Sequence, residues 1–208
     1  MAQTSSLYNE FKSLVDNSTT EAPLQKFLEE HLEILIRTFS QGALYPFVSP
    51  KFHLADEFIP DFVIVGHRSA WSWDVDLIEI EPAAFNNQAL FNKTGQSTGR
   101  LRIAETQIRN WQDWMRKNKD AIFVPRALDK LKSAGAWDER PEFYKPSDGT
   151  HQDLMVWYRI IIGRRKDFQR SGINYQSSYW ANSNYRVEIA TWDRLLEKAH
   201  HLFREDSI

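Results

Sequence analysis

The sequence contains no cysteine, and this absence excludes several kinds of site at once. A chain without thiols has no disulfide framework, no thiolate zinc site and no cysteine nucleophile. No apolar run reaches the roughly 20 residues that a membrane-spanning helix requires, and the N-terminal segment lacks the apolar core of a signal peptide. We therefore expect a cytoplasmic protein that does not bind membranes.

Other familiar motifs are missing as well. The sequence has no glycine-rich phosphate loop and no Gly-x-Ser-x-Gly elbow, so it favours neither nucleotide hydrolysis nor serine-esterase chemistry. Its six histidines form no His-x-x-x-His pair that would suggest zinc. With 26 basic and 28 acidic residues, the chain as a whole lacks the strong positive charge typical of nucleic-acid-binding domains. A local basic patch remains compatible with this balance.

Apolar residues, in contrast, are plentiful. They make up 42 % of the 208 residues, which is enough for the core of one sizeable domain. We predict a single domain over residues 1–208, with a core at about 20–198 and an N-terminal extension over 1–19.

The hydrophobic periodicity predicts an alternation of helices and strands. The predicted order is a helix, three strands, a helix and a strand, followed by an extra strand and helix, which indicates an α/β fold with a mixed central sheet flanked by helices. The predicted N-cap of the last helix is Thr191. The predicted helices are 7–14, 24–36, 100–118, 127–134 and 191–203, and the predicted strands are 43–49, 57–66, 71–81, 153–163 and 185–192.

Two of these strands carry carboxylates that are costly to bury. Residues two apart on a strand share a face, so Glu79 and Glu81 point to the same side. Asp74 and Asp76 lie on the opposite face, which argues against their joining the same site. Antiparallel pairing of the two strands would bring Asp61 beside Glu79. A buried carboxylate without a partner is protonated or strongly desolvated, so such a pair needs a cation or a hydrogen-bonding partner.

Two interpretations of these acids remain open at this point. Two or three carboxylates that converge in this way suit a hard divalent ion such as Mg²⁺. Alternatively, Asp61 merely begins a strand and the two glutamates face solvent at a sheet edge. Short Asp…Glu-x-Glu patterns arise easily by chance, so their spacing does not decide between the two.

Several segments taken together resemble a known family. The stretches PDFVIV (60–65), LIEIEPA (77–83) and IAETQIRNWQDW (103–114) are similar to the PD-(D/E)xK nuclease superfamily, with its restriction-endonuclease-like α-β-β-β-α-β core. With LQKFLEEHLEIL, RIIIGRR and EIATWDRLLE added, the chain more closely resembles the catalytic domain of the Shedu family of bacterial anti-phage nucleases. The matching segments extend over about residues 21–197.

This resemblance implies roles for particular residues. Asp61 and Glu79 match the metal-binding acids, and Glu21 is a weaker match for the acid of the first helix. Gln107 matches the glutamine of the long helix, although by itself it also fits a polar residue at the rim of the core. Glu81 occupies the position of the motif's lysine. A glutamate cannot stabilise developing negative charge as lysine does, but it could act as a general base or as a further metal ligand.

Four basic residues are candidates for contacting nucleic-acid phosphates. Arg164 and Arg165 directly follow the apolar strand 153–163, at the kind of position where ligand sites of α/β folds form. Lys93 and Arg100 flank the polar loop before the long helix.

The resemblance implies a Mg²⁺-dependent DNA endonuclease or nickase of anti-phage defence, with Mn²⁺ as a substitute metal and with DNA as its partner. It also implies a homo-oligomer, and a phage or defence-system protein is a further candidate partner. Because Glu81 replaces the lysine, a second hypothesis stays open. In that hypothesis the chain is a catalytically degenerate module that keeps the fold and binds nucleic acid or protein without cutting.

Overall fold

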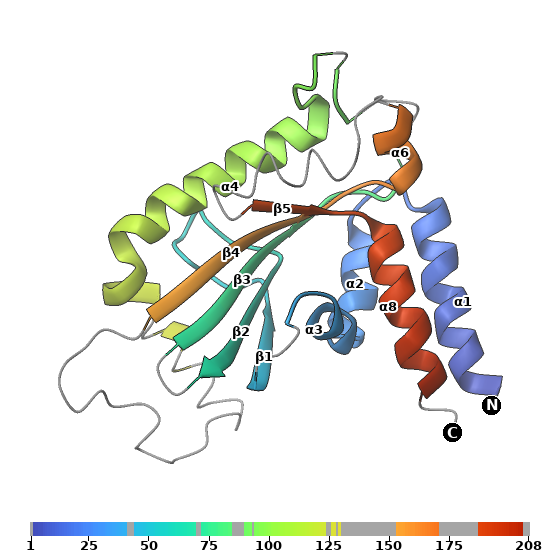
Figure 1. The fold of residues 1–208 in the computed structure, drawn as a ribbon, viewed down its shortest axis with the longest axis horizontal. Helices are drawn as coiled ribbons and strands as arrows, with labels where there is room; N and C mark the ends of the chain where they lie inside the picture. The colour runs from blue at the N-terminus through green and yellow to red at the C-terminus, as the bar shows by residue number, and fades with distance from the viewer. Residues whose placement is uncertain are drawn as a thin grey trace.

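The chain forms a mixed α/β structure in which one sheet lies between two sets of helices (Figure 1). No helix within the described ranges is both long and apolar enough to cross a membrane. Most of the helix predicted over 127–134 lies outside the described residues. The computed structural model describes residues 2–40, 44–69, 72–84, 90–92, 94–123, 126–127, 129, 153–170 and 187–205.

The sheet has five strands in the order β1-β2-β3-β4-β5. The β1–β2 and β2–β3 pairs are antiparallel, whereas β3–β4 and β4–β5 are parallel. The predicted mixed sheet flanked by helices is therefore confirmed. The strands are β1 (Leu44–Pro50), β2 (Phe62–Ser69), β3 (Ser72–Ile80), β4 (Asp153–Ile161) and β5 (Val187–Ala190).

At the edge of the sheet where the candidate site lies, β2 begins later and β3 ends earlier than predicted. β2 begins at Phe62, two residues after Pro60, because proline has no N–H to donate to the ladder. β3 ends at Ile80, so Glu81 lies one residue beyond the strand. The Glu81 N–H nevertheless donates to the Ile161 carbonyl at 2.8 Å, which keeps this residue tied to β4.

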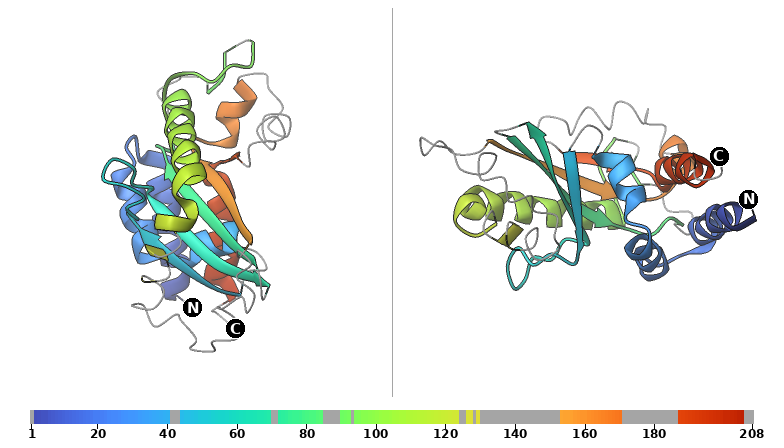
Figure 2. Two further views of the ribbon diagram at one scale, coloured as in Figure 1. Left: turned by 90° about the vertical axis from the view of Figure 1, so that its left-hand side faces the viewer. Right: turned by 90° about the horizontal axis from the view of Figure 1, so that it is seen from below.

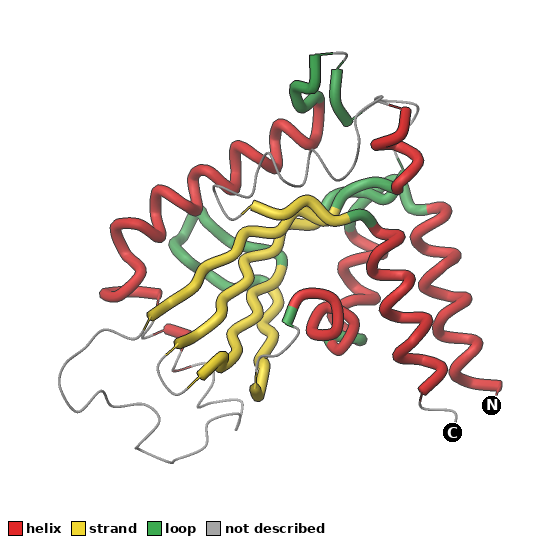
Figure 3. The backbone as a smooth tube through the Cα atoms, viewed as in Figure 1, coloured by secondary structure: helices red, strands yellow, loops and turns green. Residues whose placement is uncertain are grey.

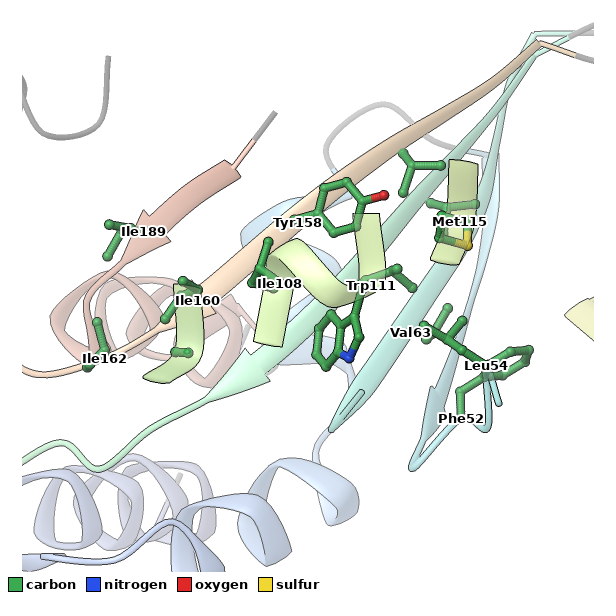
Figure 4. Close-up of a cluster of buried hydrophobic side chains, with 14 of the residues drawn as sticks. Phe52, Leu54, Val63, Ile108, Trp111, Met115, Tyr158, Ile160, Ile162 and Ile189 are labelled. Atoms are coloured by element: carbon green, nitrogen blue, oxygen red, sulfur yellow. The ribbon is translucent and has the colours of Figure 1, made fainter. Parts of the chain in front are cut away.

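One face of the sheet is covered by the long helix α4 (Gly99–Asn118), which continues into a π-helical turn at Lys119–Phe123. In Figure 4, Ile108 and Trp111 of this helix lie against the side of the sheet that carries Tyr158 and Ile160. The helix predicted over 100–118 is confirmed, and its buried residues recur at helical spacing: Leu101, Ala104, Ile108, Trp111 and Met115.

The other face packs on a group of helices at the N- and C-terminal ends of the chain (Figures 2 and 3). These are α1 (Ala2–Asn17), α2 (Ala22–Glu30), α3 (Glu33–Phe39) and α8 (Trp192–Glu205). α1 and α8 lie side by side, and both contribute aromatic side chains to this second core. A short helix, α6 (Arg165–Arg170), was not predicted from the sequence.

Two predictions in this group of helices are wrong. The helix predicted over 24–36 is two helices, because His31 leaves the helical conformation at φ −136° and ψ 57°. This break lets both Leu28 and Leu35 reach the core from helices of different direction. The predicted N-cap of the last helix is also wrong in its chemistry. Thr191 precedes α8, but its buried hydroxyl makes no hydrogen bond within the described part of the chain.

Candidate active site

The candidate site begins with a row of three residues that run across three neighbouring strands. Pro50 pairs with Phe62, and Phe62 pairs with Ile78. The row continues one residue further toward the same end of the sheet, which is the residue after Pro50, the residue before Phe62 and the residue after Ile78. Lys51, Asp61 and Glu79 therefore lie side by side at the open end of the β2–β3 hairpin. Residues opposite one another on paired strands share a face, and here that face is the one covered by α4. The predicted proximity of Asp61 and Glu79 is confirmed.

Asp61 is buried, with 8 % of its surface exposed, and both of its carboxylate oxygens have partners. Oδ2 accepts a hydrogen bond from the Ile80 N–H at 2.8 Å, which ties the start of β2 to the end of β3. Oδ1 forms an ion pair with the Lys51 ammonium. Asp61 directly precedes β2, which begins at Phe62.

Glu79 is equally buried, but fewer partners offset the cost of burying its carboxyl group. Its Oε2 atom makes no hydrogen bond among the described residues. Burial raises the pKa of Glu79 to about 9, and the negative charges of Asp61 and Glu81 add to the rise. The Lys51 charge and a hydrogen bond from the Gln107 side chain oppose this shift only in part. Without a metal, burial therefore favours the protonated form of this carboxyl group.

Gln107 reaches this row from the covering helix. It lies on α4 between the buried residues Ala104 and Ile108, and its side chain is only partly exposed. Its amide hydrogen-bonds to the Glu79 carboxyl group. The long helix thus places a polar side chain over the acid pair, as the resemblance implied, although the same contact also satisfies a polar residue at the edge of the core.

Glu81 faces a different partner. Its Oε2 atom accepts a hydrogen bond from Arg100 Nη1 at 3.3 Å, and the same nitrogen lies 2.5 Å from Glu21 Oε1. Arg100 is in the first turn of α4, while Glu21 precedes α2, so one guanidinium joins two helices to the end of β3. Burial raises the pKa of Glu81 to about 7, although the Arg100 hydrogen bond lowers it.

The remaining candidates for phosphate contact have different settings. Arg164 forms ion pairs with Asp16 at 2.6 Å and Asp193 at 2.8 Å, so it braces α1 against the start of α8. These two carboxylates compete with any phosphate for its guanidinium. Arg165 is half exposed and pairs with Glu197 at 2.5 Å. Lys93 lies outside the described residues.

The donors can be compared with what a divalent cation requires. Mg²⁺ is usually held by one or two carboxylates and keeps several water or phosphate ligands. The buried pair of Asp61 and Glu79 fits this requirement, because one Glu79 oxygen has no hydrogen bond within the described ranges. No group of three or more His, Cys, Asp or Glu side chains in the described ranges is arranged to hold a metal. The roles of Glu81 and Glu21 as further ligands thus stay predictions.

Lys51 is the site residue that the sequence interpretation missed. No motif spacing includes it, because it belongs to the strand before the hairpin and follows Pro50 at the end of β1. Its place in the row becomes visible only from the register of three strands. The one local signal was its position ten residues before Asp61, at the edge where the first hairpin opens.

Comparison with known proteins gives a family for the chain. No curated protein matches it. A family model described as "Shedu protein SduA, C-terminal" matches residues 18–196, which include all three strands of the row, the long helix α4 and the start of α8. Because the match extends over most of the sequence, this chain belongs to the Shedu family, through the C-terminal region of its SduA proteins.

Proposed function

We propose that this chain is a divalent-metal-dependent DNA endonuclease or nickase that acts in defence against phage. The defence role is supported by membership of the Shedu family. The observation that carries the chemical part is the buried oxygen of Glu79 beside Asp61, which has no hydrogen bond in the part of the chain that the structure describes. Leaving such a group unpaired costs about 1–3 kcal/mol or more when it is charged. The Glu79 carboxyl group therefore needs either a proton or a bound cation, and a bound cation would make this pair of acids a functional site.

Asp61 and Glu79 are the residues that would hold Mg²⁺ or Mn²⁺. When bound, such an ion supplies Lewis-acid stabilisation of a phosphate and lowers the pKa of a bound water. Glu79 lies in β3 and Asp61 directly precedes β2, so the register of these two strands sets how the acids lie relative to one another. Asp61 is further fixed by the Ile80 N–H, and Glu79 by the Gln107 amide.

The surrounding side chains have complementary tasks in phosphodiester hydrolysis. In this reaction a water oxygen bonds to phosphorus while the bond from phosphorus to a sugar oxygen breaks, and the leaving oxygen takes a proton from solvent. Glu81, with its pKa near 7, suits the role of the base that accepts a proton from the attacking water. Arg100 is half exposed beside it and suits a contact to a DNA phosphate.

A second candidate function is a binding module that keeps the fold and does not cut. It is favoured by Glu81, which forms an ion pair with Arg100 where the motif has a lysine. In that case the same edge of the sheet would bind DNA or a phage or defence-system protein. Assembly into a homo-oligomer is compatible with both functions.

Plasmid nicking separates the two functions. Supercoiled DNA is incubated with the wild type in Mg²⁺, Mn²⁺ or EDTA, and with the Asp61→Ala and Glu79→Ala variants. The proposal predicts metal-dependent nicking that both substitutions abolish. Asp113→Ala is the matched control, because Asp113 is an exposed acid on the outer side of α4. Nicking that survives both substitutions would reject this site, and a wild type that cuts under neither metal would favour the binding function.

A further inference from the structure

Lys51 places a positive charge directly beside the two acids. Its ammonium forms an ion pair with Asp61 Oδ1, and its backbone N–H donates to the Asp61 carbonyl at 2.9 Å. About 50 % of the Lys51 side chain is exposed, compared with 12 % of the Asp61 side chain. The ammonium therefore lies at the mouth of the site, between the buried acids and solvent.

The backbone of Lys51 indicates that this placement carries a cost. Its φ angle is 47°, in the left-handed region, and it is the only residue other than glycine with positive φ among those described. Lysine has no local hydrogen bond that favours this conformation, and glycine would adopt it without steric strain. A lysine kept where glycine fits better suggests that its side chain is needed.

The distribution of charge around the acids identifies what that side chain supplies. Arg100 is shared between Glu21 and Glu81 through one nitrogen atom. Glu81 itself is acidic where nucleases that resemble this chain carry a lysine. Lys51, directly after β1, contacts Asp61 from the other side of the acid pair.

We propose that Lys51 is a catalytic residue that supplies, from the end of β1, the ammonium that is missing at position 81. Its Nζ contacts the phosphate undergoing cleavage and stabilises the negative charge that develops there. Lys51 forms no covalent bond, since it acts as a hydrogen-bond donor and a charge. The inference rests on the proposed nuclease function, and it explains how a site with Glu81 retains a cation for the transition state.

The test compares Lys51→Gly, Lys51→Arg and Lys12→Ala with the wild type. Lys12 is the matched control, because it is as exposed as Lys51 and also pairs with an aspartate, at 2.5 Å. Three quantities are measured: the single-turnover rate of plasmid nicking at saturating Mn²⁺, the Kd for Mn²⁺ and the Tm. Glycine fits the backbone at position 51, so Lys51→Gly is expected to fold with an unchanged or higher Tm.

For Lys51→Gly we expect a rate about 100-fold lower, the usual scale for losing one donor to a transition-state charge, with a Kd for Mn²⁺ that is unchanged or tighter. Lys51→Arg should recover part of the rate, and Lys12→Ala should match the wild type. A wild-type rate in Lys51→Gly would overturn the role of Lys51 and leave the nuclease function standing. A loss of rate explained by weaker Mn²⁺ binding would also overturn it. A wild type without nicking activity would reject both proposals.

Discussion

Two clusters of buried charge, one on each face of the sheet, differ in how completely their charges are paired. On the face packed against α3 and α8, the charges of one buried cluster are matched: Arg159 pairs with Asp76 at 2.7 Å and also with Glu188, and Arg194 pairs with Glu188. Arg159 also lies over the Phe39 and Trp157 rings at 5.3 and 4.9 Å. On the face packed against α4, Glu79 is just as inaccessible, but one of its oxygens has no hydrogen bond among the described residues.

This difference separates acids that hold the fold together from acids that are available for chemistry. The network around Arg159 joins β3, β4 and β5, and Arg194 extends it to the Thr38 carbonyl of α3 at 3.2 Å. Such a network is stable only when it is complete. The pair of Asp61 and Glu79 is incomplete in the absence of a cation, which is the property expected of a binding site.

The largest effect should come from breaking the matched network. Arg159→Met leaves the carboxylates of Asp76 and Glu188 buried without their main cation, so we expect a loss of about 3–5 kcal/mol in the free energy of unfolding. Chemical denaturation measures this loss. Arg116→Met is the control, because the Arg116–Asp113 ion pair is exposed on both sides and should contribute less than about 1 kcal/mol. A small loss for Arg159→Met would show that this network is not structural.

A glutamine in place of each buried strand glutamate should have opposite effects on the two faces. Glu188→Gln removes the charge that Arg159 and Arg194 require, so its Tm should fall. Glu79→Gln removes an uncompensated acid, and its Tm in EDTA at pH 8 should rise by a few degrees, at about 2–4 °C per kcal/mol for a chain of this size. Equal destabilisation by both substitutions would contradict the distinction between the faces.

The stabilising effect of Glu79→Gln should depend on pH, because burial raises the pKa of the Glu79 carboxyl group. The Glu79 carboxyl group has an ordinary pKa of 4.5 when unfolded and a pKa of about 9 when folded. Between these values the folded state binds more protons than the unfolded state, so this group makes the protein less stable as pH rises. The advantage of Glu79→Gln should therefore grow from pH 5 to pH 8. Thermal unfolding in EDTA at several pH values measures it.

A smaller effect should follow from removing the cation between Glu21 and Glu81. Arg100→Gln takes away a hydrogen bond and a charge that lower the pKa of Glu81, so that pKa should rise above about 7. Arg100 is half exposed, so the cost in stability should stay below about 1 kcal/mol. Carboxyl NMR titration measures the pKa, with the exposed Arg102→Gln as control. An unchanged pKa of Glu81 would show that the 3.3 Å contact contributes nothing.

The smallest effect concerns a buried hydroxyl outside the site. Thr191 Oγ1 has no hydrogen bond within the described ranges, and Thr191 is fully buried. Thr191→Val keeps the shape and removes the polar atom, so the free energy of unfolding should be unchanged or higher by up to about 1 kcal/mol. Denaturation with urea measures it. A clear loss of stability would mean that the hydroxyl has a partner after all, as the sequence-based N-cap prediction supposed.

The sequence predicts the layout of this fold well where periodicity is strong. The buried stripe of α4 follows directly from the spacing of its apolar residues, because a helix brings residues at that spacing onto one face. The strand β4 follows from an apolar run of strand length. The break at His31 could not be predicted in this way. The apolar residues on both sides of it keep a helical spacing, and only the packing of α2 and α3 on the sheet decides where the chain turns.

The site was predictable in part for the same reason. Asp61 and Glu79 are joined by one hairpin, so local pattern and pairing rules bring them together. Lys51 and Arg100 come from other elements, and their contacts depend on a third strand and on how α4 lies over the sheet. The sequence alone shows that Glu81 replaces the lysine of the motif, but it does not show that Lys51 and Arg100 lie near the acids.

Mn²⁺ binding, measured by electron paramagnetic resonance at pH 8, tests the central claim most directly. The claim is that the incomplete acid pair on the α4 face is a cation site, so the wild type should bind Mn²⁺, and Glu79→Gln and Asp61→Asn should each lose this binding. Asp113→Asn, altered on the exposed side of the same helix that covers the site, should bind like the wild type. Mn²⁺ binding of equal affinity in Glu79→Gln and the wild type would contradict the claim.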